Sequence, residues 1–155
     1  MKQAAKKIEY KELQKEDLTP QQNLLLDAAK QAIQNAYAPY SHFQVGAAVL
    51  LDNGETVTGS NQENAAYPSG LCAERVALFS AHHLYPTAKV MALAIAASND
   101  GEALANPIMP CGACVQVMSE SVSRGGHTFE VLLQGETKTL LIPDALNLIP
   151  FRFEF

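Results

Sequence analysis

Eight consecutive apolar residues, 90–97, form the longest apolar run in this chain of 155 residues. Pro86 precedes the run and the turn-forming sequence Ser98-Asn99-Asp100-Gly101 follows it. An apolar run of this length without polar alternation is typical of a strand buried on both faces, and it is too short to cross a membrane as a helix. A strand buried on both faces needs helices above and below its sheet, so the run favours an α/β fold.

Helical periodicity and turn signals divide the rest of the chain into further helices and strands. Helices are expected over residues 20–36, with Thr19 as N-cap, and over about 72–83 and 111–123. Two hairpins are expected, one joining 44–51 to 55–59 and one joining 129–133 to 137–142. Asn53-Gly54 favours a tight primed turn in the first hairpin. This order predicts a three-layer α/β/α fold with a five-stranded mixed sheet.

The length and composition favour one globular domain over residues 1–155, with 48% apolar and 17% charged residues. Residues 1–17 carry five lysines against four acidic residues and are expected to form a charged, partly helical arm. This segment lacks the apolar stretch of a secretory signal, and three cysteines cannot make a complete disulfide framework. These features together predict a cytoplasmic protein.

The charge of the chain limits its partners. The net charge is −5, and the 138 residues after the arm carry six basic against twelve acidic groups. Binding to nucleic acid needs a basic surface, so neither nucleic acid nor a membrane is expected as a partner. Arg75 is the only lysine or arginine within residues 31–88, and residues 90–123 contain none. A site built from these residues therefore favours an uncharged small molecule over a phosphate.

Three cysteines lie at the expected starts of two helices, Cys72 at one and the pair Cys111 and Cys114 at the other. Zinc prefers four nitrogen or sulfur ligands, and a catalytic zinc keeps the fourth position for water. Three thiolates at helix N-termini, without a fourth cysteine, therefore favour an open catalytic site. Three other interpretations stay open: a redox pair, three inert buried cysteines, or a structural zinc site completed by His42, His82, His83 or His127.

Two charged residues lie within three positions of Cys72. Glu74 is placed to transfer protons between water and a leaving group, although an ordinary exposed glutamate in a first helical turn is the alternative. Arg75 is placed to tune the thiolates, since it can offset the negative charge that three of them leave on a divalent ion. The alternative for Arg75 is a surface arginine on the helix.

The segments Cys72-Ala73-Glu74 and Pro110-Cys111-Gly112-Ala113-Cys114 resemble the zinc-dependent deaminases. Their signature is H-x-E followed by P-C-x-x-C, with cysteine allowed in place of histidine. With segments 37–50, 60–81, 110–120 and 148–153, the chain resembles the small homotetrameric cytidine deaminases. The resemblance implies a cytidine deaminase-like fold, one Zn²⁺ per subunit held by the three cysteines, and Glu74 as the catalytic acid and base.

The resemblance also implies a reaction and a set of contacts. The reaction is hydrolytic deamination of cytidine and deoxycytidine to uridine and deoxyuridine, in pyrimidine nucleoside salvage. The positions matching substrate-binding residues are Phe43 at the pyrimidine, Asn61 and Glu63 at the ribose hydroxyls, and the backbone of Ala73 at the carbonyl of the base. Tyr67 and Phe153 match residues that reach a neighbouring subunit, so a homotetramer with sites at the subunit interfaces is expected. Val115 departs from the pattern, since many relatives have arginine there.

Three other functions stay open. A deaminase of nucleotides or nucleic acids would need cations for phosphate, which the N-terminal lysines could supply. A deaminase of another small aminopyrimidine compound is disfavoured by residues 61–64, which match ribose-binding positions. A non-catalytic zinc-binding or scaffold protein would have no use for the acid at Glu74.

Overall fold

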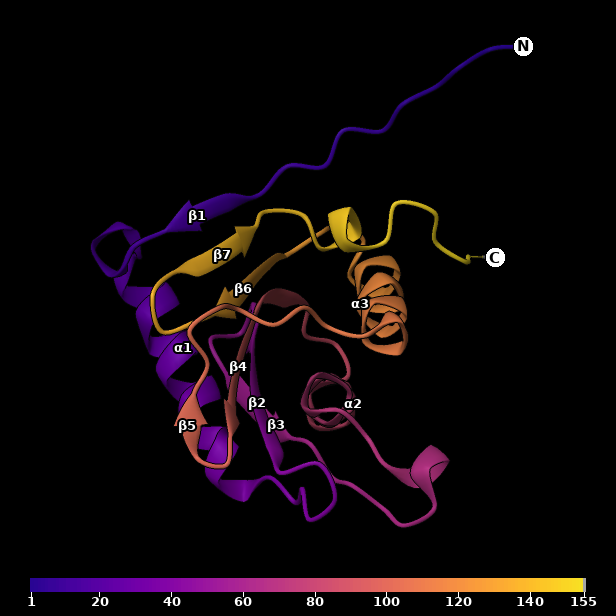
Figure 1. The fold of residues 1–155 in the computed structure, drawn as a ribbon. Helices are drawn as coiled ribbons and strands as arrows, with labels where there is room; N and C mark the ends of the chain where they lie inside the picture. The colour runs from indigo at the N-terminus through magenta and orange to yellow at the C-terminus, as the bar shows by residue number, and fades with distance from the viewer. Residues whose placement is uncertain (155) are drawn as a thin grey trace.

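A computed structural model of the chain describes residues 1–154. One mixed sheet lies between two layers of helices (Figure 1). The strands are β1 (Lys11–Leu13), β2 (Phe43–Leu51), β3 (Thr56–Ser60), β4 (Val90–Asn99), β5 (Glu102–Ala103), β6 (Glu130–Gln134) and β7 (Thr139–Ile142). They lie in the order β1-β7-β6-β4-β2-β3, and β5 pairs with β4 outside this path. The α-helices are α1 (Pro20–Ala32), α2 (Ala73–Leu84) and α3 (Gly112–Gly125).

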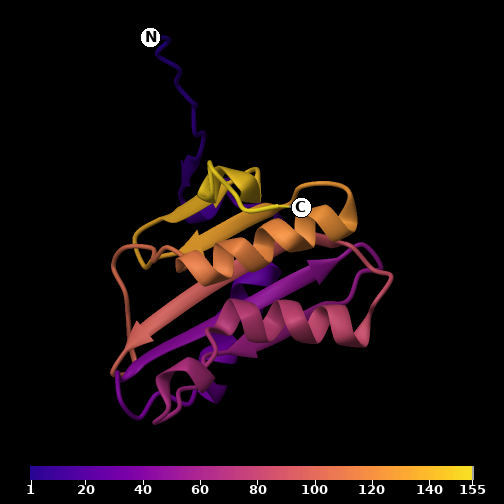
Figure 2. The same ribbon diagram turned by 90° about the vertical axis from the view of Figure 1, so that its right-hand side faces the viewer.

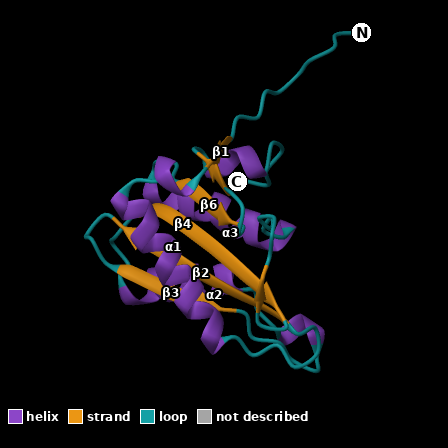
Figure 3. Cartoon of the chain, turned by 60° about the vertical axis from the view of Figure 1, so that its left-hand side comes forward, coloured by secondary structure: helices purple, strands orange, loops and turns teal. Residues whose placement is uncertain are grey.

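Central strand β4 is covered on both faces, as its apolar run predicts. Its two sets of alternating side chains belong to different core clusters. Ala92, Ala94 and Ala96 pack with Leu25 and Leu26 of α1, and Figure 3 shows α1 lying across β4 and β2. Leu93, Ile95 and Ala97 pack with residues of α2 and α3 on the opposite face. The predicted three-layer α/β/α fold is therefore confirmed.

Helices α2 and α3 lie side by side on one face of the sheet (Figure 2). Strands β3 and β4 both pair antiparallel with β2, so they run in the same direction, and β6 pairs in parallel with β4. Each helix therefore follows the carboxyl end of one parallel strand and returns the chain to the start of the next. This connectivity puts the N-termini of α2 and α3 at the same end of the sheet, where ligand sites of α/β folds form.

Two glycines allow the helices to approach the sheet closely. A Cβ atom at Gly59 in β3 would lie 2.4 Å from the backbone nitrogen of Ala77 in α2. A Cβ atom at Gly46 in β2 would lie 2.0 Å from the backbone oxygen of Ala29 in α1. Since real Cβ atoms do not come so close, a larger residue would push either helix outward. Gly59 therefore sets how near the start of α2 lies to the sheet.

The predicted number of five strands is wrong, because the sheet has seven. The two additional strands are short: β1 has three residues and β5 has two. Segments this short carry no period-two pattern, and they form because a neighbouring edge offers unpaired backbone groups. The arm was expected to be partly helical, and its regular secondary structure is instead strand β1 followed by a single 3₁₀ turn, Lys15–Asp17.

Two local details also differ from the sequence predictions. Thr19 caps α1 as expected, but the α-helix ends at Ala32 and a 3₁₀ turn, Ile33–Asn35, replaces its last predicted turn. The first hairpin forms, but only Gly54 of its turn has a positive φ, +87°. A primed turn would need positive φ at Asn53 as well, so the turn type is not the one predicted.

Candidate active site

The starts of α2 and α3 bring three sulfur atoms together. Cys72 is the N-cap residue of α2, Cys111 is the N-cap residue of α3, and Cys114 lies in the first turn of α3. The Sγ atoms of Cys72 and Cys111 are 3.8 Å apart, those of Cys111 and Cys114 are 3.5 Å apart, and all three lie within 4.8 Å of one another. Sulfur ligands at about 2.3 Å from a tetrahedral zinc ion are about 3.8 Å apart. The triangle therefore fits zinc.

Two of the other interpretations of the cysteines, the site completed by histidine and the three inert residues, find less support. Within residues 1–154, the group that could hold a metal contains no histidine. His82 instead contacts the Ser121 hydroxyl at 2.9 Å, and His42 faces Asp100. The cysteines are free thiols, and only Cys114 is buried, so they are not three inert core residues. The donor set thus leaves a fourth tetrahedral position that no described protein group fills.

The sulfurs lie in a positive environment. The N-terminal ends of two helices point at them, and Nη2 of Arg75 lies 4.0 Å from Sγ of Cys72. A hydrogen bond with Cys114, assisted by Arg75, lowers the pKa of Cys72 to about 5. The same hydrogen bond, together with burial, raises the pKa of the Cys114 thiol. Metals bind thiolates, and a lowered pKa favours the thiolate form of Cys72 at neutral pH, which suits a metal ligand.

Glu74 lies in the first turn of α2 and is only 4% exposed. Burial raises the pKa of its carboxyl group, and the negative charge on Cys72 adds to this effect. A raised pKa makes a carboxyl group a better proton acceptor and holder than an ordinary glutamate, as acid–base catalysis requires. The alternative of an exposed first-turn glutamate does not agree with its burial.

A cavity of about 510 Å³ opens beside Cys72, which is the size of a small-molecule site. Three residues expected to bind substrate, Asn61, Glu63 and Tyr67, line it. Among the described residues that line the cavity, Arg75 is the one cation, and its guanidinium is directed at Cys72. The cavity therefore offers few charges to a phosphate.

The two residues expected at the ribose are both held by the start of β2 and the loop before it. The Asn61 amide accepts from the backbone N–H of Val45 and donates to the carbonyl of Phe43, both at 2.8 Å. The Glu63 carboxylate accepts from the Ser41 hydroxyl and from the backbone N–H of Tyr40 at 2.9 Å. These contacts, the Ser41 hydroxyl first, lower the pKa of Glu63.

The other expected substrate residues lie around this centre. Phe43 is half-buried at the start of β2, and Ala73 is buried at the start of α2. Tyr67 is 79% exposed and meets Tyr40 edge to face, with ring centroids 6.5 Å apart. Phe153 is also exposed, and its carbonyl accepts from the Gln116 side chain of α3. Phe43, Ala73 and Phe153 do not line the cavity within the single subunit.

Comparison with known proteins identifies the family. The family model described as the cytidine and deoxycytidylate deaminase zinc-binding region matches residues 19–125. The chain belongs to this family. Its members are hydrolytic deaminases, so the chain is an enzyme of that class.

Relatives of this deaminase family match most of the chain. The cytidine deaminase of Halalkalibacterium halodurans is 41% identical over 79% of this chain and 89% of the relative. That of Mycobacterium tuberculosis is 42% identical over 81% of this chain and 90% of the relative. The crystal structure of cytidine deaminase from Burkholderia pseudomallei superposes with a TM-score of 0.71 at 39% identity, covering 88% of this chain and all of that chain.

Sequence reasoning missed two site residues of this deaminase, Tyr40 and Ser41. Both line the cavity and hold Glu63, although they lie more than 20 positions from it in sequence. They belong to segment 37–50, which resembles the family, but the resemblance alone assigns neither of them a role. Val115 of α3, where many relatives have arginine, is 7% exposed and packs in the hydrophobic core, which suits an apolar residue. None of the helices within residues 1–154 is long and apolar enough to span a membrane.

Proposed function

We propose that the protein is a zinc-dependent cytidine deaminase, which converts cytidine and deoxycytidine with water to uridine and deoxyuridine and ammonia. The observation that carries this proposal is the placement of a buried carboxyl group, Glu74, beside three sulfur atoms that meet at two helix N-termini. The membership of the family and its curated cytidine deaminases support it. The biological role that follows is pyrimidine nucleoside salvage.

Cys72, Cys111 and Cys114 would hold one zinc ion per subunit, and a zinc ion so held lowers the pKa of a bound water towards neutrality. Glu74 accepts a proton from the attacking water and delivers it to ring nitrogen N3. Oxygen adds at C4, and Glu74 takes the second proton from the new C4 hydroxyl and passes it to the 4-amino group. The C4–N bond then breaks, which releases ammonia as the C4 carbonyl forms. Arg75 favours the thiolate form of Cys72 through its contact with Sγ.

The remaining residues would bind and orient the nucleoside. Asn61 and Glu63 line the cavity with amide and carboxylate groups, which together can donate to and accept from ribose hydroxyls. Ala73 has a backbone N–H in the first turn of α2 that has no partner within the helix and can donate to the carbonyl of the base. Phe43 offers a half-buried ring to the pyrimidine face.

An uncharged nucleoside suits the site better than a nucleotide. A 5′-phosphate needs cations, and Arg75 faces the sulfurs, as described above. A deaminase of nucleotides or of nucleic acids is therefore the weaker candidate. Cytoplasmic location stays a prediction, which the free state of the three cysteines supports.

We also propose a homotetramer with its active sites at the subunit interfaces. Tyr67 and Phe153 expose 79% and 67% of their surfaces, so a second subunit that covers them would remove a large apolar area from water. A second subunit seated on them would bury these rings and complete the cavity. Mixing two inactive variants, Glu74→Gln and Phe153→Ala, tests the shared site, because hybrid tetramers would regain activity only if Phe153 acts on a neighbour.

The experiment that tests the proposed reaction is an ultraviolet assay of the purified, zinc-loaded protein. Cytidine, deoxycytidine and cytidine 5′-monophosphate are supplied separately, and bound zinc is measured in parallel. We expect turnover of both nucleosides, slow or no turnover of the nucleotide, and one zinc per subunit. Turnover of the nucleotide alone would refute the nucleoside assignment.

A further inference from the structure

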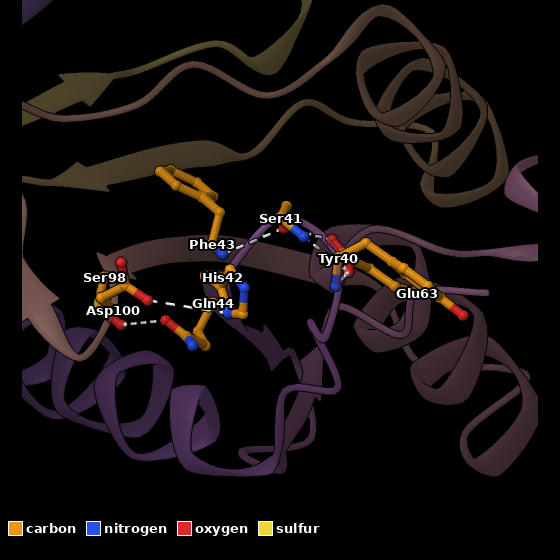
Figure 4. Close-up of polar contacts among 8 residues, drawn as sticks. All are labelled: Tyr40, Ser41, His42, Phe43, Gln44, Glu63, Ser98 and Asp100. Atoms are coloured by element: carbon orange, nitrogen blue, oxygen red, sulfur yellow. Dashed lines mark hydrogen bonds and ion pairs between the residues drawn. The ribbon is translucent and has the colours of Figure 1, made fainter. Parts of the chain in front are cut away.

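Ser41 connects two segments that, in the proposed function, would contact the two halves of a nucleoside. Its hydroxyl donates to Oε1 of Glu63 and accepts from the backbone N–H of Phe43 at 3.1 Å. Its own backbone N–H donates to Oε2 of Glu63 at 3.3 Å. Figure 4 shows Ser41 between the backbone of Phe43 and the carboxylate of Glu63, which come from segments 20 residues apart in sequence.

The contacts of Glu63 leave its carboxylate one open direction. A carboxylate has about four sites for accepting hydrogen bonds. Three of them are taken by the hydroxyl of Ser41 and by the backbone N–H groups of Tyr40 and Ser41. The remaining site is on Oε1, the oxygen that Ser41 holds, and Glu63 lines the cavity. The Ser41 hydroxyl is the donor on Oε1, so together with the two backbone N–H groups it determines which way the remaining lone pair of Oε1 points.

The position of Ser41 is itself fixed by a strained turn. The next residue, His42, has a φ of +56°, which is uncommon for a residue with a side chain. Its backbone is held from both sides, since its N–H donates to the carbonyl of Ala38 at 3.1 Å and its carbonyl accepts from Asp100 at 3.0 Å. Strain of this kind persists where surrounding contacts determine the conformation, and it often accompanies functional sites.

We propose that Ser41 is a positioning residue that aims Glu63 at a ribose hydroxyl and couples it to the base-binding strand start at Phe43. This inference rests on the proposed function, because it takes Glu63 to be a ribose contact. Ser41 does not react with the substrate; its hydroxyl acts through the carboxylate. Ser41 therefore contributes to discrimination between nucleosides with and without ribose hydroxyls.

The test compares two substrates in the zinc-loaded enzyme, cytidine and 2′,3′-dideoxycytidine. Ser41→Ala should lower kcat/KM for cytidine about tenfold, mainly through KM, because it removes one hydrogen bond to a charged group. It should change kcat/KM for the dideoxynucleoside less than about twofold, since that substrate makes no hydroxyl contact to lose. Ser41→Thr keeps the hydroxyl and should restore most of the preference for cytidine.

Controls separate this inference from the proposed function. Ser123→Ala removes an exposed hydroxyl near the end of α3 and should affect neither substrate. Glu63→Gln should also lose the preference for cytidine, because the carboxylate itself is replaced. If Glu63→Gln lowers kcat/KM for cytidine alone but Ser41→Ala lowers kcat/KM equally for both substrates, the role of Ser41 is overturned while the proposed function stands. A wild-type enzyme that deaminates no nucleoside would instead overturn the proposed function.

Discussion

Replacing Gly59 by alanine should weaken metal binding at a site that this residue does not touch. The added Cβ atom would lie 2.4 Å from the backbone nitrogen of Ala77 and 2.7 Å from the backbone oxygen of Ala73. An ordinary contact is about 3.4 Å, so α2 must move outward by about 1 Å. Overpacking of this kind costs about 1–3 kcal/mol. We expect Tm to fall by roughly 2–12 °C, at about 2–4 °C per kcal/mol for a domain of this size.

The displacement matters for zinc because α2 carries Cys72 whereas α3 carries Cys111 and Cys114. Zinc sites tolerate deviations of only about 0.2 Å in ligand distances. A shift of about 1 Å between the helices should therefore lower zinc affinity about 10- to 100-fold, the range seen when supporting contacts are lost. The measurement is the bound zinc that remains after dialysis against a competing chelator, made on folded protein well below Tm.

Gly46→Ala is the matched control for this experiment. It introduces the same methyl group, 2.0 Å from the backbone of α1 on the opposite face of the sheet. It should therefore lower Tm at least as much as Gly59→Ala without separating the sulfur ligands. Equal loss of zinc in both variants would show that general destabilisation, and not the spacing of α2, controls the metal site. Full retention of zinc and Tm by Gly59→Ala would refute the packing argument itself.

Three further predictions concern charged residues of the site. Glu74→Gln should keep bound zinc but lower kcat by about 10²- to 10⁴-fold, since it removes the proton carrier; near-normal turnover in zinc-replete protein would exclude that role. Arg75→Gln should raise the pH at which zinc is released, because Cys72 loses one of the contacts that lower its pKa and protons then compete at higher pH; zinc content measured along a pH series decides this. Hydrogen bonds from Ser41 and Tyr40 lower the pKa of Glu63 from its ordinary value of 4.5. The stability that this carboxylate adds to the fold is therefore fully present above pH 4.5, and it is lost as the pH falls through the lowered pKa. The Tm difference between wild type and Glu63→Gln should accordingly shrink on acidification, and a difference independent of pH would contradict this reasoning.

The parts of the fold that sequence patterns predict are those with long, local signals. The apolar run in β4, the helices that begin at Cys72 and Cys111, and the two hairpins all carry periodicity over several residues. The cysteine spacing likewise predicts a metal site, because a helical turn fixes how Cys111 and Cys114 relate to each other. Only the approach of Cys72 to them depends on the tertiary fold.

The parts that sequence patterns do not predict depend on contacts between distant segments. The hydrogen bond from Ser41 to Glu63 forms because the loop before β2 lies against the loop after β3. Asn61 was expected only at a ribose hydroxyl, yet its amide also ties its loop to the backbone of Val45 and Phe43. The role proposed for Phe153 requires a second subunit, and the geometry of such a contact does not follow from a pattern within one chain.

The short strand β1 changes what the molecule presents to its neighbours. Without it, β7 would be the outer strand, with the apolar sequence Leu140-Leu141-Ile142 and a row of unpaired backbone groups. Such an exposed edge recruits strands of other molecules and promotes aggregation. β1 covers this edge with Lys11 and Glu12, and Glu12 pairs with Lys138 at 2.8 Å. We therefore expect β1 to limit the growth of intermolecular sheets, so a chain that lacks only residues 1–17 would keep its cysteine site and lose colloidal stability.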